Sequence, residues 1–76
     1  MEVYVLIKTT SDGDHDVENV YNGYPTLAAL YKYMFECVTE ENDEDATEFS
    51  QELYDYQYVS AYDSHYCLNV FEMEEV

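Results

Sequence analysis

The sequence predicts an α+β fold in which an antiparallel sheet of about four strands has one or two helices packed on one face. Two observations predict it. Apolar and polar residues alternate near both ends of the chain, as in strands, whereas apolar residues in the middle recur at the spacing of an amphipathic helix. The expected order is strand, strand, one or two helices, strand, strand. With 76 residues, the chain should form a single compact domain over 1–76.

The first hairpin is predicted at the N-terminal end. Residues 2–9 alternate cleanly, and both sides of this strand have apolar members, which is typical of a central position in a sheet. A polar segment, 10–16, should form the turn, because its Gly13 can adopt a positive φ. A second strand is expected over 17–24, ended by Gly23, with Val17 and Val20 on opposite sides.

A helix should begin after Pro25, with the Thr26 hydroxyl as its N-cap. The stripe expected to be buried against the sheet consists of Leu27, Leu30, Tyr31, Met34, Phe35 and Val38. The side expected to face outward carries Lys32, Tyr33, Glu36 and Cys37. A break is expected near 39–42, and one bent helix is the alternative.

The second helix would start with the acidic residues 43–45, which the helix dipole favours at that end. Its narrow apolar seam would be Ala46, Phe49, Leu53 and Tyr56. Two further alternating segments, 56–62 and 65–73, predict a C-terminal hairpin whose turn is Asp63 and Ser64.

The charge is extreme. Eighteen Asp and Glu residues stand against two lysines, Lys8 and Lys32, and the formal net charge is −16. Most carboxylates therefore have no basic partner, and their repulsion should destabilise the compact state until salt screens it. The chain should be repelled by nucleic acid and by anionic membranes, so we expect a basic partner.

One acidic stretch stands out. Its seven carboxylates over 41–55 are Glu41, Asp43, Glu44, Asp45, Glu48, Glu52 and Asp55. A helix of this length spans about 21 Å. That gives one charge per roughly 3 Å, close to the ~3.4 Å per phosphate along one DNA strand. Ordinary charged helices mix both signs, whereas like charges four residues apart destabilise a helix. We therefore interpret the stretch as a partner-binding surface; a solvated face is the alternative.

Three aspartates, Asp12, Asp14 and Asp16, resemble the start of a calcium loop. The later positions do not fit, because Val17 stands where the loop needs Gly and Gly23 where it needs Glu. A solvated hairpin tip with at most weak divalent binding is expected. We expect no metal site and no other cofactor.

The residues that could carry catalysis are not arranged for it. His15, His65, Cys37 and Cys67 are isolated, and none is tied by spacing to a base or a metal. We expect a protein that is not an enzyme. The two cysteines should be reduced thiols, and no apolar run approaches a membrane span, so a cytoplasmic protein is expected.

Ten tyrosines are present, and several crowd the last third of the chain: Tyr54, Tyr56, Tyr58, Tyr62 and Tyr66. They could provide rigid contact area beside the acids. Equally, tyrosine suits half-buried strands.

The acidic segments TEENDEDATEFSQELYD, DGDHD and EMEE, the absence of arginine and the small size resemble a class of inhibitors encoded by phages and mobile elements. These proteins imitate DNA to block host proteins, and they include anti-CRISPR proteins, anti-restriction proteins and inhibitors of uracil-DNA glycosylase. The resemblance covers composition and size, not a shared motif.

The resemblance implies an anti-CRISPR protein that occupies the DNA-binding surface of a CRISPR effector in the host cytoplasm. The carboxylates of 41–55, helped by Asp12, Asp14 and Asp16, would contact the basic side chains of that target. The alternatives are an inhibitor of a restriction enzyme or glycosylase, an acidic adaptor that binds another basic protein, and an ion-binding protein. A monomer is expected, or a homodimer through a tyrosine-rich sheet face if the acids point away from it.

Overall fold

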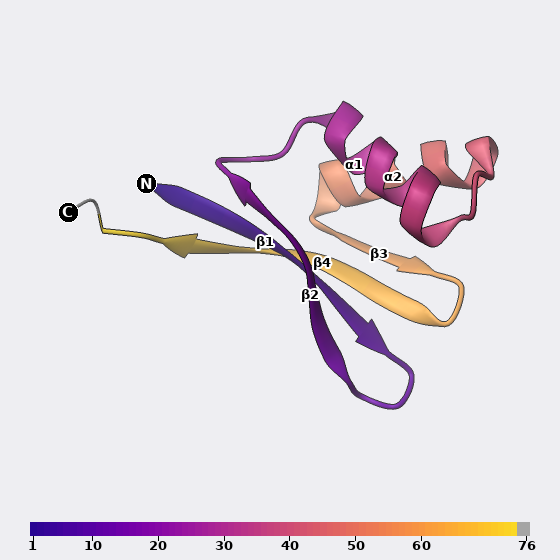
Figure 1. Ribbon diagram of the computed structural model, residues 1–76, viewed down its shortest axis with the longest axis horizontal. Helices are drawn as coiled ribbons and strands as arrows, with labels where there is room; N and C mark the ends of the chain where they lie inside the picture. The colour runs from indigo at the N-terminus through magenta and orange to yellow at the C-terminus, as the bar shows by residue number, and fades with distance from the viewer. Residues whose placement is uncertain (75–76) are drawn as a thin grey trace.

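The computed structural model describes residues 1–74 and confirms the α+β fold: helices cover one side of a four-stranded antiparallel sheet (Figure 1). The elements in order are β1 (Glu2–Thr10), β2 (His15–Asn22), α1 (Leu27–Tyr33), the π-helical turn η1 (Met34–Val38), α2 (Asp43–Tyr56), β3 (Tyr58–Ala61) and β4 (Ser64–Glu72). The strand order is β2-β1-β4-β3, so the first strand is central, as predicted.

The two faces of the sheet differ in what covers them. Leu6 of β1 pairs with Leu68 of β4, and both belong to the buried core, together with Val59 of β3. Alternation along β1 places Val3 and Val5 on the opposite side, away from this core. We call that side the open face.

A β-bulge in β2 explains why its sequence alternates imperfectly. Leu6 pairs with Asn19 and Ile7 pairs with Val17, which leaves Glu18 as the extra residue. Val20 pairs with Val5, so Val17 and Val20 both lie on the open face. The expectation that these two valines point to opposite sides was wrong, because the bulge shifts the alternation by one residue.

Both α-helices begin at a side chain that caps their first turn. The Thr26 hydroxyl accepts a hydrogen bond from the Ala29 amide at 3.1 Å, and the Asn42 side chain accepts one from the Asp45 amide at 3.2 Å. Between the helices, Glu40 and Glu41 have φ of 53° and 70°, which a continuous helix does not allow. The chain therefore has two helices, and the single bent helix is excluded.

The core is a cluster between the helices and the sheet. Its buried residues are Leu6, Leu30, Tyr33, Met34, Ala46, Leu53, Val59, Ala61, Tyr66 and Leu68. Phe35, Val38 and Phe49 pack against this cluster and are partly exposed. Most of the apolar stripe predicted for each of the two helices is therefore confirmed.

Three predictions about the helix seams were wrong. Tyr33 was expected outward, but it is 9% exposed and its ring meets that of Tyr66 edge to face. Leu27 was expected inside and is 38% exposed. Tyr33 is buried because its side of α1 meets Tyr66 of the sheet, whereas Leu27 lies on the side toward α2, where it lines a hollow with Ser50. Tyr56, the last residue of α2, is 74% exposed.

Several boundaries also differ from the prediction. β2 begins at His15 and ends at Asn22, so Asp16 lies in a strand and not in the turn. β3 begins only at Tyr58, because Tyr56 completes α2 and Gln57 caps it with a φ of 62°.

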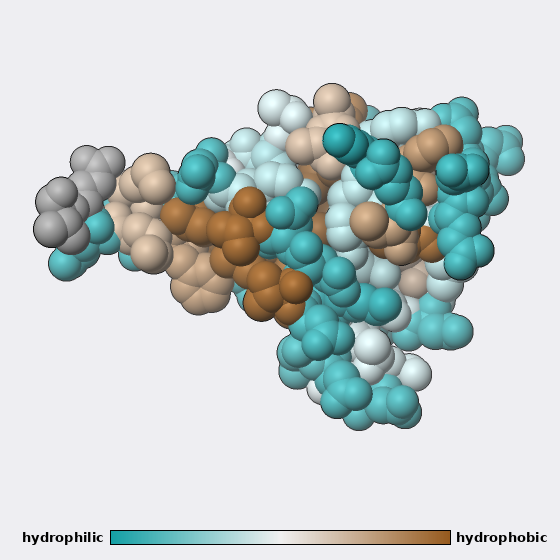
Figure 2. Space-filling view, in the orientation of Figure 1, coloured by the Kyte–Doolittle hydropathy of each residue, from teal (hydrophilic) through white to brown (hydrophobic). Residues whose placement is uncertain are grey.

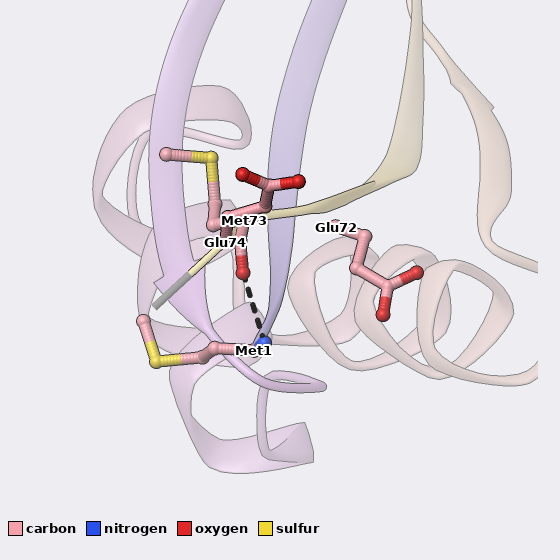
Figure 3. Close-up of a pocket in the computed structure, with 4 residues that line it drawn as sticks. All are labelled: Met1, Glu72, Met73 and Glu74. Carbon is pink, nitrogen blue, oxygen red and sulfur yellow. Dashed lines mark hydrogen bonds between the residues drawn. The ribbon is translucent and has the colours of Figure 1, made fainter. Parts of the chain in front are cut away.

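The molecule is elongated, with extents of 41 × 29 × 19 Å. The paired ends of β1 and β4 project past the helices and carry Met1 and the last described residues (Figure 1). There the Met1 ammonium donates to the Met73 carbonyl at 3.0 Å, and these two residues with Glu72 and Glu74 line a hollow (Figure 3).

Candidate partner-binding surface

Helix α2 carries most of the acidic stretch, and its turn of about 3.6 residues decides where each carboxylate points. Ala46, Ser50 and Leu53 are buried on one side. The carboxylates on the opposite, exposed side are Glu44, Glu48, Glu52 and Asp55. We call these four residues the acidic ridge. It extends over about 17 Å at ~1.5 Å per residue.

The ridge is less dense than the sequence suggests. Counted in the same way as the seven carboxylates over about 21 Å, four carboxylates over about 17 Å give one charge per about 4 Å, compared with ~3.4 Å per phosphate along a DNA strand. The closer spacing predicted from the sequence counted Glu41, Asp43 and Asp45, which lie off the ridge. Glu41 is in the left-handed connection before α2, and its amide donates to the Phe35 carbonyl at 2.8 Å.

Asp43 and Asp45 hold α2 in place. The Tyr31 hydroxyl of α1 donates to the Asp43 carboxylate, and the Tyr62 hydroxyl donates to the Asp45 carboxylate at 2.6 Å. Each hydrogen bond raises the pKa of its tyrosine, because the carboxylate favours the protonated hydroxyl. Two of the predicted partner-binding residues therefore tie the start of α2 to α1 and to the β3–β4 turn.

The aspartates of the first hairpin lie apart from the ridge. Asp12 and Asp14 are exposed in the turn between β1 and β2. Asp16 lies in β2, opposite Lys8 of β1 in the strand register. Figure 1 shows this turn at the lower edge of the molecule and α2 at the upper right. The structure therefore does not merge the two acidic sets into one surface.

The tyrosines divide between the core and the surface. Burial raises the pKa of Tyr33, and the nearby Glu18 carboxylate raises it further. Tyr24 meets Tyr4 and Tyr54 edge to face, with ring centroids 5.1 and 5.4 Å apart. Tyr56 is free on the surface, one helical turn beyond Glu52.

Of the groups that could carry catalysis, His15, His65 and Cys67 lie on the sheet, whereas Cys37 lies exposed in η1. The His65 ring nitrogen is 2.7 Å from the Ser60 hydroxyl and 2.9 Å from the Tyr58 hydroxyl. Cys67 lies two residues further along β4, but burial raises the pKa of its thiol, whereas a nucleophilic cysteine needs a lowered pKa. The Cys67 thiol is therefore not an activated nucleophile.

Within residues 1–74, no three His, Cys, Asp or Glu side chains are grouped as metal ligands would be. In the hollow of Figure 3, the Glu72 and Glu74 carboxylates point away from each other, so they do not form an acid–base pair. In the same described part of the chain, no helix is both long enough and apolar enough to cross a membrane.

Sequence reasoning missed the open face. The periodicity of β1 showed apolar residues on both of its sides, which was the available signal. What it did not show is that the helices cover only one of them.

Comparison with known proteins gives no relative: no family model matches the chain, and no curated protein or solved structure matches it either.

Proposed function

We propose that this protein inhibits a basic DNA-binding protein of a host defence system, most concretely a CRISPR effector. The acidic ridge of α2 would occupy the surface that otherwise binds DNA. The observation that carries the proposal is a row of four exposed carboxylates on a helix that contains no basic residue.

Repulsion within the acidic ridge destabilises the isolated protein. Glu44, Glu48 and Glu52 follow one another at four-residue spacing, where each like-charged pair destabilises a helix by about 0.2–0.5 kcal/mol. Lys8 lies in β1 and Lys32 in α1, so neither lysine is part of α2. A cationic partner would remove this repulsion on binding, which supports a role for the ridge in recognition.

The ridge is also held in a defined position. Asn42 caps the first turn of α2, and the hydroxyls of Tyr31 and Tyr62 hold its first two aspartates. Leu53 anchors the other half of the helix in the core. A preorganised row of charges loses little conformational freedom on binding. Its long-range attraction to a basic groove would speed association, and salt would slow it.

The test compares two triple variants with equal charge. The ridge variant carries Glu44→Gln, Glu48→Gln and Glu52→Gln; the control carries Asp12→Asn, Asp14→Asn and Asp16→Asn. Each tagged protein is used to capture partners from a lysate of bacteria with CRISPR and restriction systems, and captured proteins are challenged with duplex DNA.

We expect the wild type and the hairpin control to capture a nucleic-acid-binding protein that DNA displaces, and the ridge variant to lose it. Retention by the ridge variant would exclude the ridge as the contact. An equal loss in both variants would mean that only total charge matters.

A second function is favoured by the spacing of the ridge, which is wider than that of DNA phosphates. An acidic adaptor for a basic protein would need no match to DNA. In that case the captured partner would still depend on the ridge, but duplex DNA would not displace it.

A further inference from the structure

The open face differs in chemistry from the rest of this protein. The strand pairings assign to it the odd-numbered residues of β1 and β4, residues 15, 17, 20 and 22 of β2, and residues 58 and 60 of β3. None of these positions carries Asp, Glu or Lys. Because 18 of the 76 residues are acidic, an extended face without a carboxylate is a strong departure from the remaining surface.

The centre of this face is apolar and exposed. Val20 and Val17 are 55% and 65% exposed, and Phe71 and Tyr58 are 51% and 50% exposed. Val5 lies among them, paired with Val20. Figure 2 shows hydrophobic atoms gathered where β1, β2 and β4 run together, while hydrophilic atoms surround the helices and the β1–β2 turn.

The bulge in β2 contributes directly to this surface. In a regular strand, residues 17 and 20 would point to opposite sides. The bulge turns both valines to the open face, whereas Glu18 comes close enough to the buried Tyr33 to raise its pKa. Without the bulge, Glu18 and Asp16 would both lie opposite open-face positions of β1; with it, neither carboxylate enters this face.

We propose that the open face is the interface of a homodimer, in which two copies pack their sheets against each other. A basic partner would gain little here, because the face offers no carboxylate to pair with its cations. The complementary surface is another neutral apolar one, and the chain's own open face meets this requirement under a two-fold axis.

The size of the face fits this role. Four strands at about 4.8 Å and nine residues at about 3.3 Å give a footprint of roughly 500 Å², allowing for the short β3. Side chains that stand up from a sheet expose more area than this flat footprint. The face is therefore of the order of the ~800 Å² per partner in a specific interface, and sheets twisted like this one pack aligned at about 30°.

The charge does not prevent the association. Stacked sheets lie ~10 Å apart, and each bears a helical layer of about 10 Å on its far side. The two helical layers would thus face outward, separated by more than the Debye length of ~8 Å at physiological salt. Both acidic ridges would remain free for other partners.

The test uses two valines of matched exposure on opposite faces. Val20 is 55% exposed on the open face, and Val70 is 53% exposed on the other side of the sheet, where it pairs with Tyr4. The wild type, Val20→Glu and Val70→Glu are compared by sedimentation equilibrium from micromolar to millimolar protein at physiological salt. Far-UV circular dichroism checks that both variants fold.

We expect the wild type and Val70→Glu to dimerise with similar Kd, and Val20→Glu to raise the Kd by at least about 100-fold, since it places two like charges in a desolvated interface. A monomeric wild type over this whole range, or equal Kd values for the two folded variants, would overturn the proposal. The ridge variant described above should still dimerise, so the two proposals can fail independently.

Discussion

At the scale of single residues, identical side chains have opposite roles. Tyr33 is a core residue between α1 and β4, while Tyr56 extends into solvent from the end of α2. The helical spacing had suggested the reverse. Their stability contributions should follow burial and not the sequence pattern.

Tyr33→Ala should lower the free energy of unfolding by about 3–5 kcal/mol, as for other large aromatic residues removed from a core. Tyr56→Ala should change it by less than about 0.5 kcal/mol. Urea unfolding followed by circular dichroism measures both. If the two variants lost the same stability, the packing of α1 described above would be incorrect.

At the scale of elements, helix α2 positions the acidic ridge. Its two ends differ in how well the residue at each end suits the backbone conformation there. Asn42 provides a favourable N-cap. At the other end, Gln57 adopts a φ of 62° in the left-handed region, where glycine is the usual residue.

Asn42→Ala should therefore destabilise the protein by about 1 kcal/mol, because the Asp45 amide loses its acceptor. Gln57→Gly should stabilise it by roughly 0.5 kcal/mol, because glycine has no Cβ to strain this conformation. Thermal unfolding of the two variants gives the sign of each change. A stabilising Asn42→Ala would contradict the assigned cap.

At the scale of the whole molecule, charge and hydrophobicity are separated. Among the described residues, most carboxylates lie on the helical side and in the two turns of the sheet, and the positions of the open face carry none. Because of this separation, the acidic ridge and the apolar open face lie on different sides of one small domain, and each could contact a different partner.

The net charge of −16 should make stability depend on salt. Screening that adds about 1 kcal/mol would raise the Tm by roughly 4–8 °C in a domain of this size. We expect such a rise between low and moderate sodium chloride, and a smaller one for the ridge variant, whose net charge is −13 after three carboxylates are neutralised. A Tm independent of salt in the wild type would show that carboxylate repulsion has no measurable cost.

The sequence alone determined the α+β class, the order of the elements, the central place of β1, the cap at Thr26, and the excess of negative charge. These properties are local: they depend on alternation, helical spacing and the chemistry of a few neighbouring residues.

Tertiary structure alone decided which side of each element is covered. It buried Tyr33, left Tyr56 exposed, turned Val17 and Val20 to one face through the bulge, and placed the Asp12 turn away from the ridge. The physical reason is that periodicity shows an element has two unlike sides, whereas the neighbour that covers one of them comes from a distant part of the chain.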